Sequence, residues 1–199
     1  MRRISQRDPK WSSVKIGDSK TDLATAGCLL CSISMLHSKF YPKLTEWIQP
    51  PALASGCKFV KQGTDPEPHF LAWTLTDWSK YGLKFIWRSY TYNPVTDMPK
   101  IKEYCASKDY GVALCVQTKS GGMHWVACES TSAIGDYSVN DPINGKRLWK
   151  VSGFLAPYKK ITGYVIFKHE WITWLSRECK ENWQGDYEIP IQTVRNINS

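Results

Sequence analysis

Three side chains of this sequence have the types needed for nucleophilic chemistry: a thiol, an imidazole and a carboxylate. The thiol belongs to Cys28, which follows Thr25, a residue that can cap a helix, and Gly27, which can turn tightly. A thiol in the first turn of a helix faces unpaired backbone N–H groups and the positive end of the helix dipole, and both favour the thiolate. Cys28 therefore has the setting of a nucleophile. The alternative is a buried helix whose cysteines only pack.

The imidazole and the carboxylate are those of His124 and Asp141. His124 follows two glycines at the start of an expected strand, and Asp141 ends the next expected strand, just before Pro142. Neighbouring antiparallel strands can bring such residues together, and a carboxylate bound to one ring nitrogen orients the other toward a nucleophile. Asn140 is the competing orienting residue, because alternation along a strand lets only one of the two face the histidine. A packing histidine and an Asp-Pro turn are the structural alternatives.

The helix that would carry Cys28 extends to about Phe40, because apolar residues recur at helical spacing from Leu29 to Leu36. Further helices are expected over 44–48, 70–78, 98–105 and 171–183, with a loop over 54–67. Strands are expected over 83–90, 111–117, 124–128, 137–142 and 161–168. Helices thus precede an antiparallel sheet, which is the order of an α+β fold.

The composition is that of one domain large enough to bury a core, with 199 residues, 42% hydrophobic and 22% charged. The net charge of +8 suggests an acidic partner, such as nucleic acid, an anionic envelope or an acidic protein. The 26 Lys and Arg residues are scattered, without a nucleic-acid motif, so we expect no dedicated nucleic-acid site. Ten Trp and ten Tyr residues are unusually many, and they suit a core, a binding surface or contacts within a larger assembly.

The seven cysteines are odd in number and irregularly spaced, which argues against a secreted disulfide framework and favours a reducing compartment or free thiols. No apolar region follows Met1, so we expect no signal peptide, and no apolar run reaches the length of a transmembrane segment. The expected location is cytoplasmic or, since incorporation into a virion needs no signal, virion-associated.

Cys28 and Cys31 form a Cys-x-x-Cys pair at a helix start, as in a thioredoxin-like dithiol. Such a dithiol follows a strand in a βαβ unit, whereas residues 12–25 are polar and rich in turn residues. A zinc site would need two more ligands at suitable spacing, and the sequence has no second Cys-x-x-Cys and no His-x-x-x-His. We therefore expect neither redox chemistry nor a metal or other cofactor.

Four short blocks, in order along the chain, resemble those of the papain-like cysteine peptidases. They are Gln6-Arg7-Asp8-Pro9-Lys10-Trp11, Gly27-Cys28-Leu29-Leu30, Gly121-Gly122-Met123-His124-Trp125-Val126 and Val139-Asn140-Asp141-Pro142. The resemblance covers about residues 4–168 and favours the branch of double-glycine leader (bacteriocin-processing) peptidases and their stand-alone bacterial or phage relatives. It implies that Cys28 is the nucleophile, His124 its acid–base partner and Asp141 the orienting carboxylate. Gln6 would help to bind the oxyanion, as the glutamine before the cysteine does in that family.

The resemblance implies a papain-like peptidase domain over residues 1–168, in which the helix of Cys28 packs on an antiparallel sheet. Residues 169–199 have no counterpart in the family and would form a C-terminal helical extension and tail. The expected function is that of a cysteine peptidase that hydrolyses a peptide or amide bond. Two others stay open: a cell-wall (peptidoglycan) amide hydrolase, whose anionic envelope would suit the positive charge, and a virion structural or binding protein that has kept the fold. Cys31 is not something the family requires.

Overall fold

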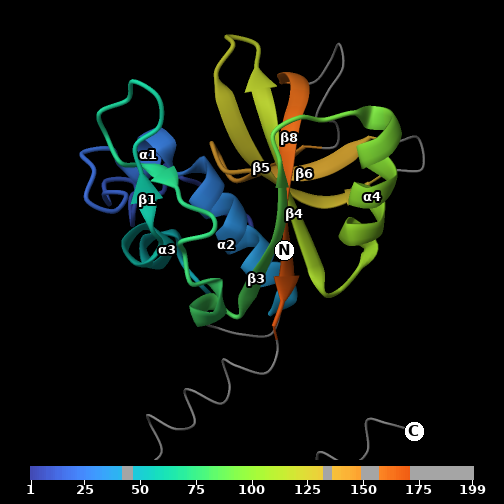
Figure 1. Cartoon of the computed structure of the whole chain (residues 1–199), viewed down its shortest axis with the longest axis horizontal. Coiled ribbons are helices and arrows are strands. Elements are labelled where there is room, and N and C mark those ends of the chain that lie inside the picture. The colour runs from blue at the N-terminus through green and yellow to red at the C-terminus, as the bar shows by residue number, and fades with distance from the viewer. Residues whose placement is uncertain (42–46, 132–135, 149–156, 171–199) are drawn as a thin grey trace, which may run out of the picture.

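The computed structural model describes residues 1–41, 47–131, 136–148 and 157–170, and its architecture is mixed α+β (Figure 1). The helices lie mostly in the first half of the chain and the longer strands in the second half. The expected fold class is therefore confirmed at this level. The helix expected over 171–183, and with it the C-terminal extension beyond residue 170, lies outside the described residues.

In the described part of the chain, three α-helices and a small ribbon precede the sheet, whose first strand is followed by one further α-helix. The helices are α1 (Leu23–Ala26), α2 (Cys28–Phe40), α3 (Pro50–Gly56), the short 3-10 helix η1 (Trp78–Tyr81) and α4 (Pro94–Ala106). A small ribbon consists of β1 (Phe59–Val60) and β2 (Phe70–Leu71). The strands of the main sheet are β3 (Leu83–Ser89), β4 (Tyr110–Thr118), β5 (Met123–Thr131), β6 (Tyr137–Asp141), β7 (Lys146–Leu148) and β8 (Tyr158–His169).

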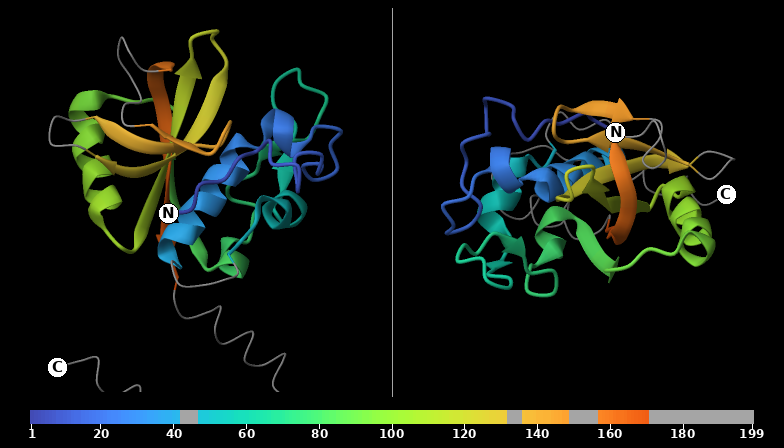
Figure 2. Two further views of the ribbon diagram at one scale, coloured as in Figure 1. Left: turned by 180° about the vertical axis from the view of Figure 1, so that it is seen from behind. Right: turned by 90° about the horizontal axis from the view of Figure 1, so that it is seen from above.

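The main sheet has six strands in the order β3-β8-β4-β5-β6-β7, and every neighbouring pair is antiparallel. It is covered by helices from both sides: Figure 2 shows α2 and α4 on opposite sides of the strands. Side chains of β4 alternate between the two faces. Ala113 and Cys115 pack in the cluster beside α2, whereas Val112, Leu114 and Val116 pack in the cluster beside α4. This two-sided burial explains the continuous apolar run that predicts the strand.

α2 is the central helix of the fold, and ten of its thirteen residues are buried. Gly111 on β4 permits its close approach, because a Cβ at that position would lie 3.0 Å from Phe40 Cζ and 3.2 Å from Leu36 Cδ2. The helix expected from Cys28 to about Phe40 is confirmed, and so is its packing on the antiparallel sheet.

The helix expected over 70–78 is wrong. The first two residues of that range form β2, and Leu75 is 67% exposed, so it does not face the core. The helical spacing puts Leu71, Leu75 and Trp78 on one side; Leu71 and Trp78 are buried, but Trp73 is buried in place of Leu75. The Trp78 indole N–H donates to the Trp73 carbonyl oxygen at 2.8 Å, and burial of these two indoles decides the local structure.

The loop expected over 54–67 is wrong in part. α3 starts at its prolines, because proline suits the first turn of a helix, where its missing N–H is not needed, and it extends to Gly56. β1 then pairs with β2 within the same range. β7, which pairs with β6, was not expected either, since three residues give no readable pattern. The helix expected over 44–48 lies partly outside the described residues, and its described residues 47–48 are not helical.

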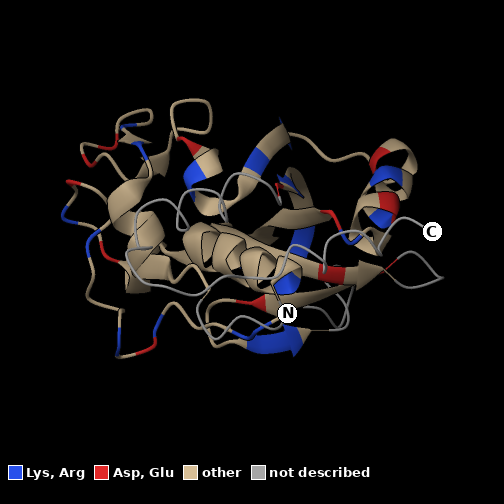
Figure 3. Ribbon diagram, turned by 90° about the horizontal axis from the view of Figure 1, so that it is seen from below, with Lys and Arg blue, Asp and Glu red and all other residues tan. Residues whose placement is uncertain are grey.

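Charged side chains are widely distributed over the described part of the chain. Lys and Arg lie on helices, strands and loops and are interleaved with Asp and Glu (Figure 3). The net charge of +8 is therefore not concentrated on one described element. None of the described helices combines the length and the apolar character needed to cross a membrane.

Candidate active site

Cys28 is the first residue of α2 and lies where two helices meet. Thr25, the expected cap of its helix, instead donates its backbone N–H to the Asp22 carboxylate, the cap of α1, at 3.0 Å. A Cβ at Gly27 would lie 2.4 Å from the Leu23 carbonyl oxygen, so a glycine is needed at this junction. The Cys28 side chain is half-buried, whereas the other five described cysteines are buried. Among these six thiols, Cys28 is the accessible one.

His124 and Asp141 lie on neighbouring strands, and their side chains meet. His124 Nε2 lies 2.8 Å from Asp141 Oδ1, and both residues are buried. The register of β5 and β6 pairs Ala127 with Asn140. The same register places Asp141 opposite Val126, two residues along β5 from His124. Asp141 and His124 are therefore diagonal neighbours, and side chains of their length can bridge the distance between diagonal positions. The expected contact is present, and strand register is its cause.

Two further groups hold the Asp141 carboxylate in place. The Tyr158 hydroxyl donates to Oδ2 at 2.5 Å, and the Ile143 backbone N–H donates to Oδ1 at 2.9 Å. Burial by itself would raise the pKa of Asp141, but hydrogen bonds from His124, Tyr158 and Ile143 lower it below its usual value. Asp141 is therefore a fixed carboxylate at neutral pH. Tyr158, whose ring also stacks on His124, was missed at the sequence level because nothing around it marks it among the ten tyrosines.

His124 has a second partner, the Cys28 side chain. Burial would lower the pKa of His124, but hydrogen bonds with Asp141 and Cys28, together with the charges of these two groups, raise it to about 9. Because Asp141 occupies Nε2, Nδ1 is the ring nitrogen left for Cys28. At neutral pH the site thus holds a protonated imidazole between a carboxylate and a sulfur atom.

Gln6, the fourth expected site residue, is buried and binds the chain close to two of the other three in sequence. Its backbone N–H donates to the Pro142 carbonyl oxygen at 2.7 Å, next to Asp141. Its side-chain Nε2 donates to the Ala24 carbonyl oxygen at 2.7 Å, one turn before Cys28. The amide has a second N–H for another acceptor. The N-terminal arm therefore connects the segment before the thiol with the strand end that carries the carboxylate.

Two alternatives raised by the sequence have other positions. Asn140 does not face the histidine: its side-chain amide donates to Met1 Sδ at 3.2 Å. Cys31 is fully buried, and burial, with a smaller contribution from the charge of Cys28, raises its pKa well above the usual range. A thiol that is inaccessible and protonated is a poor partner for dithiol exchange. Within the described residues no group of three or more His, Cys, Asp or Glu side chains could hold a metal ion.

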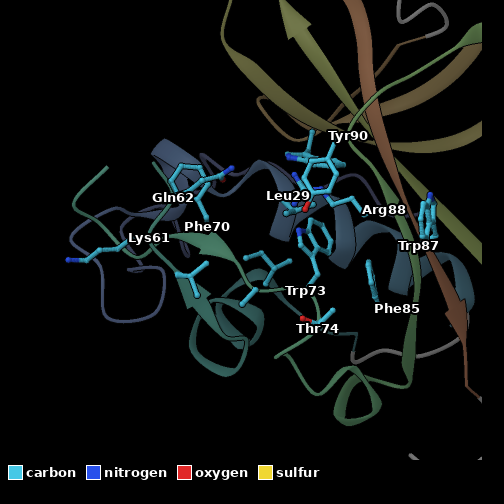
Figure 4. A pocket seen from close by; sticks show the side chains of 14 residues that line it. Leu29, Lys61, Gln62, Phe70, Trp73, Thr74, Phe85, Trp87, Arg88 and Tyr90 are labelled. Carbon is cyan, nitrogen blue, oxygen red and sulfur yellow. The ribbon is translucent and has the colours of Figure 1, made fainter. Parts of the chain in front are cut away.

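The thiol opens onto a cleft formed by two adjoining cavities. The smaller, of about 250 Å³, is lined by Cys28 itself and by His69 and Met123. The larger, of about 540 Å³, is called the aromatic pocket here; Trp73, Trp87, Arg88 and Tyr90 are among its lining residues (Figure 4). Leu29, Phe70, Leu71 and Trp125 line both cavities. An extended ligand in contact with Cys28 can therefore continue into the aromatic pocket.

Comparisons of the chain with protein-family models, with curated proteins and with solved structures find no match. What the site can do therefore follows from its own atoms. An accessible thiol beside an imidazole can transfer its proton and attack an electrophilic carbon. The buried carboxylate on the far side of the ring stabilises the resulting imidazolium. The arrangement suits acyl transfer from a carbonyl compound.

Proposed function

We propose that this chain is a cysteine peptidase, a thiol hydrolase that cleaves a peptide or amide bond through a covalent thioester. One observation carries the proposal: a buried imidazole is bound by the Asp141 carboxylate at 2.8 Å on one side and by Cys28, at the start of α2, on the other. This geometry allows His124 to take the thiol proton and to keep it next to the thiolate.

The fold proposed with this function is papain-like. Its support is topological: a helix that begins with the cysteine packs on an antiparallel sheet, and the histidine and the carboxylate come from neighbouring strands of that sheet. The N-terminal arm that carries Gln6 contacts both regions. The four blocks that resemble the family in sequence thus converge on one place in the structure.

In the first half of the reaction, the Cys28 thiolate attacks the carbonyl carbon of the substrate. The developing oxyanion accepts hydrogen bonds from the backbone N–H of Cys28, which as the first residue of α2 has no acceptor within its own helix, and from the second N–H of the Gln6 amide. The His124 imidazolium gives its proton to the leaving amine, the C–N bond breaks and the thioester remains.

In the second half, His124 is neutral and acts as a general base. It takes a proton from water, whose oxygen attacks the thioester carbon through a second oxyanion held by the same two donors. The C–S bond then breaks, the acid product leaves and the proton on His124 is again shared with Cys28. Asp141 keeps the ring oriented through both halves and stays ionised.

A cell-wall amide hydrolase is the second candidate function. The net charge of +8 and the aromatic lining of the cleft favour it, since cell-wall peptides lie in an anionic envelope. A virion structural or binding protein that keeps this fold is the alternative from another class. For each of these functions, we propose a cytoplasmic or virion-associated location.

The test combines thiol labelling with turnover. Limiting iodoacetamide should modify Cys28 first among the seven cysteines, as located by peptide mapping. Quenched fluorescent peptides and purified peptidoglycan cross-link peptides should then distinguish a peptidase from a cell-wall hydrolase. Cys28→Ala should abolish cleavage, and Cys57→Ala, which removes a buried thiol outside the site, should preserve it. Indiscriminate labelling together with no cleavage of either substrate would leave the binding-protein function.

A further inference from the structure

Arg88, on β3, occupies an unusual position in the aromatic pocket. Its guanidinium carbon lies 4.1 Å from the ring centroid of Tyr90, 4.8 Å from that of Trp73 and 5.6 Å from that of Trp125. Figure 4 shows Arg88 between the Tyr90 and Trp73 side chains, directed into the pocket. The rings attract the cation through their π faces and shield it from water.

No acidic side chain compensates the charge of Arg88 in the described part of the chain. None of the described ion pairs includes it, and its Nε is buried without a hydrogen-bond acceptor. Burial lowers the pKa of Arg88, while the interactions with Tyr90 and Cys115, neither of them a carboxylate, act in the opposite direction. The residues lining the pocket include a second cation, Lys61, and neither Asp nor Glu. Arg88 is only partly buried, but its Nε has lost water and gained no acceptor, so the guanidinium is suited to an anion brought by a ligand.

The position of Arg88 connects this unpaired charge to the reaction. Trp125, one of the rings next to Arg88, directly follows His124 in sequence and lines both the pocket and the cavity of Cys28. Leu29, which follows Cys28, also lines both. A peptide held at Cys28 can therefore extend along the cleft to Arg88.

We propose that Arg88 binds a carboxylate of the substrate, so that the enzyme selects acidic peptides. The carboxylate belongs either to a Glu or Asp side chain near the scissile bond or to the free C-terminus of a short peptide, since both present the same two oxygens to the guanidinium. The three rings pack against the neighbouring atoms of the substrate. This inference rests on the proposed peptidase function and specifies its substrate class.

The test measures binding separately from cleavage. The Cys28→Ala protein is titrated with acetylated hexapeptide amides in which one Glu is scanned through the positions, with matched Gln peptides, and with a Glu-free hexapeptide that ends in a free carboxylate. Quenching of tryptophan fluorescence reports binding, because Trp73 and Trp125 flank the guanidinium. At one position, or with the free C-terminus, the carboxylate peptide should bind roughly ten- to one-hundredfold more tightly than its amide counterpart.

Arg88→Met, made in the Cys28→Ala protein, should remove this preference, because it keeps the apolar bulk and loses the charge. Lys84→Met is the matched control: it removes a cation from an exposed position of the same strand, outside the pocket, and should retain the preference. Far-UV circular dichroism checks the fold of each variant. If Arg88→Met does not fold, Arg88→Lys serves as the test variant in its place. It keeps the charge but loses the planar fork, so the preference for the carboxylate peptide should weaken.

Equal binding of the Glu, Gln and free-acid peptides to the Cys28→Ala protein would overturn the inference, and so would a preference that survives in Arg88→Met. Failure of the proposed function looks different. In that case the unmodified protein binds the carboxylate peptide through Arg88 and does not cleave it. Cleavage without any carboxylate preference, in contrast, would retain the peptidase and discard the role of Arg88.

Discussion

Cys28 and the pair Cys105–Cys128 place thiols on the two opposite sides of the sheet, and only the first is equipped for chemistry. Cys28 is half-buried, begins α2 and shares a hydrogen bond with His124. Cys105 and Cys128 are buried beside α4 with their sulfur atoms 3.2 Å apart. The hydrogen bond with Cys105 and burial raise the pKa of Cys128 far above its usual value. Reactivity therefore depends on access and on a basic neighbour, not on the side chain itself.

The most direct test of this difference in reactivity is to remove Cys28 and Cys128 in turn. Cys28→Ala should lower kcat/KM by about 10⁴–10⁶, because the covalent step is lost. Cys128→Ala should leave kcat/KM unchanged and lower the free energy of unfolding by about 1 kcal/mol, the effect of a small cavity. Steady-state kinetics and urea denaturation measure the two effects. Comparable activity losses in both variants would mean that the two sides do not differ as described.

Asp141→Asn tests the carboxylate that supports His124 beside Cys28. The variant keeps the shape of the side chain but cannot stabilise the imidazolium, so kcat should fall by about 10³–10⁴. Cys28 should also react more slowly with iodoacetamide at neutral pH, although it stays more accessible than the buried thiols. Asn140→Asp restores a carboxylate one residue away, on the other face of the strand, and should not rescue Asp141→Asn.

Gln6→Ala separates oxyanion binding from thiol activation. Loss of one of the two donors should reduce kcat by roughly 10²–10³, about 3–4 kcal/mol of transition-state stabilisation. Labelling of Cys28 should change little, because the imidazole and the thiol remain in place. The free energy of unfolding should fall by only about 1 kcal/mol, for the hydrogen bond to the Ala24 carbonyl oxygen. An unchanged kcat would remove Gln6 from the catalytic site.

Raising the pH should separate cleavage from alkylation. The folded-state pKa of His124, about 9, exceeds the usual value of 6.5, so the imidazolium persists at neutral pH and disappears above about pH 9. Turnover should then fall about tenfold per pH unit, because the leaving amine receives no proton, whereas iodoacetamide, which needs none, continues to react with Cys28. The stability contributed by this proton should be complete below pH 6.5 and lost as the pH rises through about 9. Parallel pH profiles for cleavage and alkylation would contradict this assignment.

Among the changes at the site, Tyr158→Phe should have the smallest effect on turnover. The ring still packs on His124, but Asp141 loses the hydroxyl donor at 2.5 Å. We expect a decrease in kcat of about tenfold or less and a loss of stability of about 1.5–3 kcal/mol, typical of a hydrogen bond to a charged group. The titration of His124, followed by NMR, should move in the variant. An unshifted titration would make the tyrosine a packing residue only.

The sequence predicts α2 and the strands of the sheet centre well, because helical spacing and continuous apolar runs report burial directly. It also predicts that His124 meets Asp141, since a turn before one strand and a proline after the next fix where each strand begins and ends. The roles of Tyr158 and Arg88 could not be predicted in this way. The role of Tyr158 depends on which strands become neighbours, and that of Arg88 on the absence of an acidic side chain nearby in the described structure. Neither can be read from the adjacent sequence. The helix wrongly expected over 70–78 has the same origin, because the burial of Trp73 and Trp78 is decided by distant parts of the chain.

The place of β8 in the sheet determines when the candidate site can assemble during synthesis. As the last described strand in sequence, β8 nevertheless lies between β3 and β4 and pairs with both. A nascent chain that ends before Tyr158 has β3 without a partner and a four-stranded sheet whose β4 edge is open, and the Asp141 carboxylate has no Tyr158 donor. The ribosome must therefore release the chain to about residue 169 before the thiol and its partners are assembled. If the chain has the proposed activity, translation products that end before β8 should lack it.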